Sequence, residues 1–382
     1  MTPLHVVGPE RSGGAAAVAR SVQALVGGAV YAPSATPIQQ AWRTIAGMRS
    51  HKAEWEMRWE IRKQRPEVIH LHRFSAIGTV AIAAAWNERV PVVWSCYDYW
   101  PFCARDNLCA PDGPCDGRRS CLSCYRPKGG HWPWVANLAL VGRRQRILRW
   151  LNRLDAVIAL SEHSRTLLRA HGVTALIHVV PPPVEVTDEA LFTRSLRMRD
   201  INELGPPPRI VWAGWLAPNK GVEVFIQACA EVRAVMSGVQ CVAFGVVSDP
   251  VYAHRMALRA DLAGVHLVAD TPAEAMPHEA LLREVARADV LVCTEQWPNP
   301  AALIILEARA MGVTVVAPRI GGIPEFVSDR FLYGPCGNHK ELARAILNAL
   351  NDPTPAPMVM ATNDEVRDRI LSVYNMVTKG YK

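Results

Sequence analysis

Residues 294–327 read TEQWPNPAALIILEARAMGVTVVAPRIGGIPEFV and set an acid and a pair of glycines where a parallel sheet would open. The apolar run and the LEARAMG segment predict a helix that ends at Gly312, and residues 313–317 predict a β-branched strand. Glu307, near the start of that helix, can accept hydrogen bonds from hydroxyls, and the glycines at 321–322 let backbone amides approach an anion. The segment therefore suits a ligand that carries both phosphate and sugar.

A plainer interpretation exists for the same segment. Glu307 would then be a solvated helix residue, and the glycine pair would be an ordinary turn. A segment this short does not decide between the two interpretations, so the rest of the chain must.

The length and composition of the chain limit its class. Its 382 residues exceed what one hydrophobic core usually holds. Half of the residues are hydrophobic and a fifth are charged, which is typical of a soluble globular protein and excludes a disordered one. The best candidate for a membrane span, residues 80–86, is far shorter than the ~20 residues required, and residues 1–20 lack the features of a secretion signal. We expect two domains in a cytoplasmic protein.

The net charge of +7 is concentrated in the first half of the chain, and the sequence pI is about 9.0. Two helix-compatible stretches, residues 42–65 and 143–153, mix arginine with tryptophan. Either could lie on an anionic membrane surface. Alternatively, both are solvated helix faces whose tryptophans enter the core. We expect no nucleic-acid partner, because no recognised binding motif accompanies the charge.

Strands and helices alternate along the first half of the chain. Strands are expected at residues 4–7, 68–72, 92–95 and 155–160, and helices at residues 15–26, 76–86 and 161–172. Ser161 is a good N-cap for the last of these helices, and Gly172 is a good stop. The order βαβα predicts a parallel sheet wrapped by helices.

The second half restarts the same pattern. Strands are expected at residues 210–213, 240–244, 265–269 and 289–293, and helices at residues 221–236 and 277–288. We divide the chain into a first domain (1–183) with a cysteine-rich insert (103–124), a linker (184–208) between two proline runs, a second domain (209–357), and a C-terminal helix (358–382) that crosses back to the first domain. Two doubly wound domains that face each other would share one ligand cleft.

Four segments carry a resemblance to a known family. They are GPERSGG (8–14), AGWLAPNKG (213–221), WPNPAALIILEA (297–308) and GGIPE (321–325), of which the last two are the most specific. Over nearly its whole length the chain resembles the retaining glycosyltransferases of the fourth sequence family, also called glycosyl transferases group 1. The resemblance implies the GT-B fold, in which two Rossmann-like, doubly wound parallel-sheet domains face each other across a cleft.

The resemblance also implies roles for individual residues. The donor-binding residues would be Glu307, Ala302, Leu303, Trp215, Gly13 and Gly14. Glu307 would bind the ribose of a nucleotide donor, because two hydroxyls suit one carboxylate. The glycines would let the backbone approach the diphosphate, which Lys220 would neutralise as charge develops on the leaving group. Lys220 could instead be an exposed loop lysine.

The chain departs from the family at three polar positions. Asn299 stands where the family has a glutamate that faces the donor sugar, and Trp215 where it has an arginine. Tyr97, directly before Asp98, stands where the family has a histidine. The resemblance therefore assigns the catalytic roles to Lys220, Asn299, Tyr97 and Asp98, three of which lie at or beside altered positions.

These departures affect the expected chemistry. Asn299 can still orient a sugar hydroxyl, but the lost charge would stabilise an oxocarbenium-like transition state less, by about a few kcal/mol. Trp215 could stack on the donor base or sugar, or pack between the domains. Glu295 could replace the missing carboxylate, although it would need a different loop path.

Five of the ten cysteines fall between positions 103 and 124, which suggests a thiolate metal site rather than disulfides in a cytosolic chain. Four would suffice for tetrahedral zinc. Some family members have similarly spaced cysteines, and this resemblance selects Cys103, Cys115, Cys121 and Cys124 as ligands of a structural zinc. His131 is an alternative to Cys103, and free thiols in a surface insert are the alternative to any metal.

The function that we expect from the resemblance is sugar transfer with retention of configuration, without a metal in the chemistry. The donor would be a UDP-, GDP- or dTDP-sugar bound by the second domain, and an unidentified acceptor would bind the first. The protein would be cytoplasmic, with a peripheral contact to an anionic membrane as a further expectation. A catalytically silent GT-B protein that binds nucleotide or activates a partner enzyme is the main alternative, and an enzyme that joins cyclitols is another.

Overall fold

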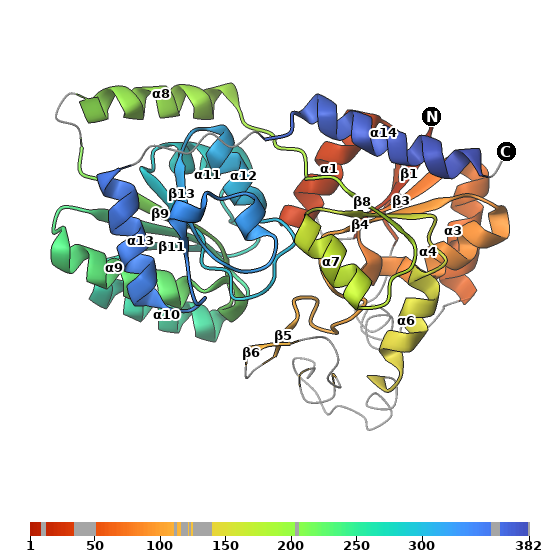
Figure 1. Ribbon diagram of the computed structural model, residues 1–382, viewed down its shortest axis with the longest axis horizontal. Coiled ribbons are helices and arrows are strands. Elements are labelled where there is room, and N and C mark those ends of the chain that lie inside the picture. Colours follow the sequence, from red (N-terminus) through yellow and green to blue (C-terminus); the bar gives the residue numbers. More distant parts are fainter. Residues whose placement is uncertain are drawn as a thin grey trace. The chain divides into compact units, whose positions relative to one another are not determined.

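The computed structural model describes residues 1–8, 13–33, 51–110, 113–115, 121, 124, 140–202, 206–352 and 360–380. The chain divides into two compact units, Met1–Pro183 with Ala361–Lys382, and Val184–Met360. Each unit contains a six-stranded sheet whose strand pairs are all parallel in the described part of the chain. The predicted fold class, two α/β parallel-sheet domains, is confirmed (Figure 1).

The sheet of the first unit has the strand order β2–β1–β3–β4–β7–β8. The strands are β1 (Pro3–Val6), β2 (Ala29–Tyr31), β3 (Val68–Leu71), β4 (Val92–Cys96), β7 (Ala156–Ala159) and β8 (Leu176–Val179). The helices are α1 (Gly14–Val26), α3 (His51–Gln64), α4 (Phe74–Glu88), α6 (Arg143–Leu151), α7 (Glu162–Ala170) and α14 (Asn363–Lys379). A short hairpin of β5 (Cys109–Ala110) and β6 (Gly113–Pro114) follows β4. Strands β1, β3, β4 and β7 are buried along their whole length, as expected of parallel strands that helices cover on both faces.

The sheet of the second unit has the strand order β11–β10–β9–β12–β13–β14. The strands are β9 (Arg209–Leu216), β10 (Gln240–Val247), β11 (His266–Asp270), β12 (Val290–Val292), β13 (Thr314–Pro318) and β14 (Leu332–Tyr333). The α-helices are α8 (Asp188–Asn202), α9 (Val222–Val235), α10 (Pro250–Ala263), α11 (His278–Ala286), α12 (Leu303–Ala310) and α13 (His339–Asn351). The 3-10 helices are η1 (Pro218–Lys220), η2 (Ile323–Glu325) and η3 (Asp329–Phe331).

The order of strands in the second sheet decides where a ligand can bind. From β9 the chain moves one way to β10 and β11, and then returns to place β12 on the other side of β9. From these two neighbouring strands the chain thus continues toward opposite edges of the sheet. Their carboxyl ends form a topological switch point, where open α/β sheets bind their ligands.

The segment 184–208 is not the plain linker that its polar composition predicts. It contains α8, which packs against α11 and belongs to the second unit. Arg194 donates hydrogen bonds to the carbonyl oxygens of Ala288 (2.6 Å) and Gly312 (2.8 Å), and Arg197 forms an ion pair with Asp289 at 2.6 Å. These inward polar contacts fix a helix whose large apolar side chains, such as Phe192, are largely exposed.

The C-terminal helix α14 groups with the first unit, where it packs along α1 (Figure 1). Thr362 begins it with a capping box, in which its hydroxyl accepts from the Glu365 amide and the Glu365 carboxylate accepts from the Thr362 amide. Tyr374 lies buried on this helix and bonds to His70 of β3. Residues from the two ends of the chain thus share one core.

Two tryptophans of the first arginine-rich stretch stay outside the core, contrary to the second interpretation of that stretch. Trp55 and Trp59 on α3 are 68% and 53% exposed. Arg143, at the start of the other stretch, is buried instead, where it donates to the Trp100 carbonyl at 2.7 Å. Among the described helices, none has both the length and the apolar character that a membrane crossing requires.

Candidate functional site

The loops after β9 and β12 are bound tightly to each other. Gly221 has φ of 70°, and a Cβ atom at this position would lie 2.1 Å from the Thr294 carbonyl oxygen, so only glycine permits the contact. The Thr294 hydroxyl donates to the Lys220 carbonyl at 2.8 Å and accepts from the Trp212 indole N–H at 2.8 Å. The backbone N–H of Gln296 donates to the backbone carbonyl of Asn219 at 2.9 Å. These bonds fix where the two loops present their side chains.

A buried carboxylate lies where the two loops meet. One oxygen of Glu295 accepts from the Lys220 ammonium at 2.6 Å and from the Asn299 amide nitrogen at 3.1 Å. The other oxygen accepts from the Trp297 indole N–H. The Glu295 side chain is 8% exposed and that of Lys220 24%. We call Lys220, Glu295, Trp297 and Asn299 the Glu295 cluster. Lys220 is therefore not the exposed loop lysine that the sequence left open.

The glycine pair at 321–322 serves this loop rather than a free anion site. Gly321 has φ of 62°, and a Cβ atom there would lie 2.7 Å from the backbone nitrogen of Asn299. The Gly322 amide donates to the Asn299 carbonyl at 2.9 Å. The turn after β13 thus supports the backbone of Asn299, and the Gly322 amide already has a partner.

Glu307 lies on α12 and is only 2% exposed, which excludes the interpretation as a solvated helix residue. One carboxylate oxygen lies 2.7 Å from the Nε2 atom of His278, the first residue of α11, whose side chain is 48% exposed. The helix that carries Glu307 starts at Leu303, after Ala302 as an N-cap residue without a polar side chain. Sequence reasoning missed His278, because no motif accompanies it.

Trp215, at the end of β9, is half-buried and pairs with Val246 of β10.

In the first unit, Gly13 is the N-cap of α1 with φ of 100°, and Gly14 has open space around the position of a Cβ atom. Residues 9–12 of the predicted phosphate loop lie outside the described residues. The start of α1 carries no acidic side chain in its first turn, which is compatible with an anion near the helix N-terminus.

Tyr97 joins a chain of hydrogen bonds whose direction is fixed. The Gly27 carbonyl can only accept, so the His5 Nε2 atom at 2.9 Å carries a proton. Burial lowers the pKa of His5, although the bond to Gly27 acts in the other direction, and burial lowers the pKa of His72 further. In the neutral rings His5 Nδ1 accepts from His72 Nε2 at 2.8 Å, and His72 Nδ1 accepts from the Tyr97 hydroxyl at 2.8 Å. Tyr97 therefore points its hydrogen at His72.

A second group of hydrogen bonds lies beside the first. Burial raises the pKa of Tyr97, and Ser95 acts in the other direction. The His70 ring connects Ser95 to the C-terminal helix, because its Nε2 atom lies 2.8 Å from Ser95 Oγ and its Nδ1 atom 2.6 Å from the Tyr374 hydroxyl. Burial, followed by the charges of His72 and His5, holds the pKa of His70 well below its usual range. A directed chain of hydrogen bonds thus runs from Tyr97 to Gly27, and His70 joins Ser95 to Tyr374 beside it.

Asp98, the neighbour of Tyr97, shapes the turn that follows β4. Its carboxylate accepts from the Trp100 amide at 3.0 Å, and its carbonyl accepts from the Cys96 thiol at 3.3 Å. Burial, with the nearby Asp98 charge, holds the pKa of the Cys96 thiol well above its ordinary value. Asp98 is thus held close to the hydrogen bonds that Tyr97 makes.

The geometry does not support the four-cysteine zinc site. In the described part of the chain, the one group of three metal-ligating side chains whose ligand atoms gather within 4.8 Å is His5, His70 and His72. Cys103, Cys115, Cys121 and Cys124 do not form such a group, and His131 lies outside the described residues. Each ring nitrogen of the three histidines already has a hydrogen-bond partner, which accounts for their proximity without a metal.

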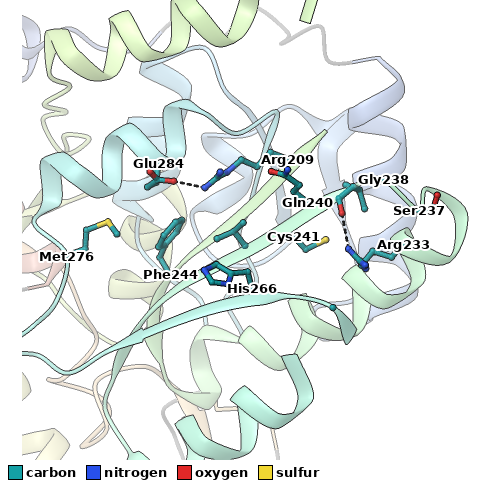
Figure 2. Close-up of a pocket in the computed structure, with 13 residues that line it drawn as sticks. Arg209, Arg233, Ser237, Gly238, Gln240, Cys241, Phe244, His266, Met276 and Glu284 are labelled. Carbon is teal, nitrogen blue, oxygen red and sulfur yellow. Dashed lines mark hydrogen bonds and ion pairs between the residues drawn. The ribbon is translucent and has the colours of Figure 1, made fainter. Parts of the chain in front are cut away.

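A cavity of about 660 Å³ lies elsewhere in the second unit (Figure 2). Its lining includes the first residues of β9, β10 and β11, namely Arg209, Gln240 and His266. It therefore opens at the amino ends of the strands, whereas the Glu295 cluster lies at the carboxyl ends. Its Arg209 is ion-paired with Glu284 at 2.5 Å. We assign it no role in donor binding.

The two parallel-sheet units have the architecture of the GT-B proteins, and comparison with solved structures shows the same fold. Anabaena Alr3699/HepE in complex with UDP-glucose superimposes with a TM-score of 0.65 at 17% identity, over 100% of this chain and 99% of that one. The catalytic domain of Starch Synthase IV from Arabidopsis thaliana, bound to ADP and acarbose, gives a TM-score of 0.66 at 11% identity, over 99% of each chain.

Family comparison divides the chain in the same way. Residues 4–188 match Glycosyltransferase Family 4, and residues 195–367 match Glycosyl transferases group 1. The chain belongs to the group 1 glycosyltransferases, as its sequence motifs predict.

Relatives of known activity are similar over part of their length. A GDP-mannose-dependent alpha-(1-6)-phosphatidylinositol monomannoside mannosyltransferase of Mycolicibacterium smegmatis is 32% identical over 47% of this chain and 48% of that protein. A D-inositol 3-phosphate glycosyltransferase of Xylanimonas cellulosilytica is 30% identical over 59% of this chain and 58% of that protein. The chain thus aligns with about half the length of these relatives.

The buried histidines make the stability of the first unit depend on pH. Their folded pKa values lie below the usual 6.5, so between the two values the unfolded state binds more protons. The free energy of unfolding should therefore fall as the pH drops below about 6.5, by up to about 1.4 kcal/mol per pH unit for each histidine. Thermal unfolding from pH 7.5 to 5 measures this dependence. We expect a flatter profile for His70→Gln, with the exposed His254→Gln as control. Identical profiles for His70→Gln and the wild type would contradict a neutral, buried His70.

Metal analysis of the purified protein tests the zinc site that the family resemblance implies. The zinc site would be supported if the wild type held about one zinc per chain and a variant with both Cys121 and Cys124 changed to serine held none. Zinc below about a tenth of an equivalent would remove it.

Proposed function

We propose that this protein transfers a sugar from a nucleotide-sugar donor to a hydroxyl acceptor with retention of configuration. The observation that carries the proposal is the position of the Glu295 cluster, which includes Lys220, at the switch point of the second sheet. Fixed polar groups at this edge are what a diphosphate and a sugar require. Membership of the group 1 glycosyltransferases supports the same reaction.

Two residues of the second unit would hold the nucleotide. Glu307 can accept from ribose hydroxyls while it keeps its bond to His278, because a carboxylate offers about four lone-pair positions. Lys220 would neutralise charge on the diphosphate as the bond to the sugar breaks. Gly13 and Gly14 of the first unit remain predicted diphosphate ligands on the resemblance alone.

Retention follows from the resemblance in this proposal. The acceptor hydroxyl would attack the sugar carbon from the face that the diphosphate leaves. The bond from that carbon to the diphosphate oxygen breaks, the bond to the acceptor oxygen forms, and the hydroxyl proton passes to the diphosphate. A metal takes no part in these steps.

The relatives suggest which donors and acceptors to test first. Their names specify GDP-mannose in one case, and a phosphatidylinositol monomannoside or D-inositol 3-phosphate as acceptors. We therefore infer that UDP-, GDP- and dTDP-sugars with inositol phosphates or inositol lipids are the best first substrates.

The silent GT-B protein remains the competing function, because three polar positions differ from the family at once. Asn299, Trp215 and Tyr97 stand where the family has a glutamate, an arginine and a histidine. A silent protein would bind nucleoside diphosphates and release none from any sugar nucleotide. Turnover with one donor would exclude it.

Exchange of the buried carboxylate on α12 tests donor binding. Glu307→Gln keeps the side-chain shape and removes the charge, so we expect at least tenfold weaker binding of the matching nucleoside diphosphate, since charged hydrogen bonds contribute about 1.5–3 kcal/mol. Calorimetry measures the affinity, and nucleotide release in the presence of acceptor measures turnover. Glu231→Gln, 50% exposed in the same unit, is the control. Unchanged affinity in Glu307→Gln would remove Glu307 from the donor site.

We also propose that the first unit contacts anionic membranes through α3. Trp55 and Trp59 lie four residues apart on one face of this helix, and both are more than half exposed. The Lys63 ammonium lies 5.0 Å from the centre of the Trp59 ring. Exposed tryptophan beside lysine suits the interface of a bilayer with negative headgroups.

Vesicle binding tests this surface. We expect the wild type to sediment with phosphatidylglycerol vesicles and not with phosphatidylcholine vesicles, and Trp55→Ser with Trp59→Ser to bind at least tenfold more weakly. Phe192→Ser removes an equally exposed apolar side chain from the second unit and serves as the control. Equal binding by the double variant and the control would argue against α3 as the contact.

A further inference from the structure

The Glu295 cluster contains a carboxylate close to the position where the family has its acid. Glu295 precedes Asn299 by four residues, yet its Oε1 atom lies 3.1 Å from the Asn299 amide nitrogen. The loop between them folds back, supported by Gly321 behind Asn299, so that both side chains reach the same point. The different loop path that a replacement acid requires is therefore present.

Both ends of the Asn299 side chain are bound within the loop. Its amide nitrogen donates to Glu295, and its Oδ1 atom accepts from the Ala301 amide at 3.2 Å. With a side chain that is itself buried, Asn299 connects Glu295 to the start of α12. This geometry suits a residue that positions a neighbour better than one that binds a sugar alone.

The contacts that hold Glu295 in place are more than the stability of the fold requires. Three donors from two loops converge on it, from Lys220, Trp297 and Asn299. A buried ion pair adds little net stability, because desolvation offsets much of the Coulomb attraction. An ion pair kept at the ligand-binding edge of a sheet therefore points to a role in the chemistry.

We infer that Glu295 is a positioning residue that supplies, from position 295, the negative charge that the family places at position 299. It fixes the Lys220 ammonium and the Asn299 side chain, and its own negative charge, next to Asn299, acts on the donor sugar through space. Positive charge develops on the sugar as its bond to the diphosphate breaks, and a fixed carboxylate favours that state over the ground state. The inference rests on the proposed transfer reaction and explains how it survives the change at position 299.

The inference separates turnover from binding. Loss of the Glu295 charge should lower kcat, whereas a diphosphate should bind as well as before or more tightly, because an anion next to Lys220 has been removed. A purely structural role would instead weaken binding, turnover and thermal stability together. This difference makes the role of Glu295 measurable.

An exchange of the two side chains provides the decisive test. E295Q should reduce kcat roughly a hundredfold, while affinity for the matching nucleoside diphosphate stays within threefold or improves. N299E alone should also impair the enzyme, because two carboxylates would lie about 3 Å apart. E295Q with N299E restores one acid and one amide, so kcat should recover at least tenfold relative to E295Q. Glu231→Gln is again the control.

The outcomes separate this inference from the proposed function. E295Q with kcat within threefold of an active wild type, or an exchange variant no faster than E295Q, would overturn the role of Glu295 and leave the transfer reaction in place. A wild type that turns over no sugar nucleotide would overturn the transfer reaction and this role with it. Should E295Q not fold, the exchange variant still decides, because kcat within tenfold of the wild type supports a movable charge and a hundredfold loss opposes it.

Discussion

The contact between the loops after β9 and β12 determines the candidate site. Both strands lie side by side at the centre of the second sheet, so their loops leave it together. Gly221 permits an approach that any Cβ atom would prevent, and Thr294 ties both loops to the core through Trp212. Lys220 and Glu295, which are 75 residues apart in the sequence, become partners only because of this approach. An alanine at position 221 would separate charge from countercharge without touching either.

The sequence predicted the elements of this fold better than their contacts. Buried β-branched runs such as β13 can be recognised from residue type alone, and so can the family motif around Glu307. The adjacency of β9 and β12 is not encoded in a local pattern, so the pairing of Lys220 with Glu295 could not be predicted, although Glu295 was considered as a replacement acid. His278 is separated from Glu307 by 29 residues and belongs to no motif, and only the packing of α11 against α12 reveals it.

The misread linker has a different cause. The two proline runs lie outside helices and strands, but the polar residues between them were interpreted as a linker between domains. Arg194 and Arg197 turn inward and bind carbonyl oxygens and Asp289, so α8 is held by polar contacts that an apolar periodicity cannot show. The exposed tryptophans of α3 are the converse case, since a residue type that usually packs inside remains at the surface.

The hydrogen-bond chain of the first unit links parts of the sequence that have no local relation. Its directed part runs from Tyr97 through His72 and His5 to the Gly27 carbonyl beside β2, and His70 joins Ser95 to Tyr374 on the last helix. Because the Tyr97 hydroxyl donates to His72, its oxygen can only accept from any further partner. A ligand group that binds this oxygen must therefore be a donor, such as an alcohol, whereas an ether or a carboxylate has no hydrogen to donate. A backbone carbonyl beside β2 thereby determines, through two histidines, which chemical groups can bind at Tyr97.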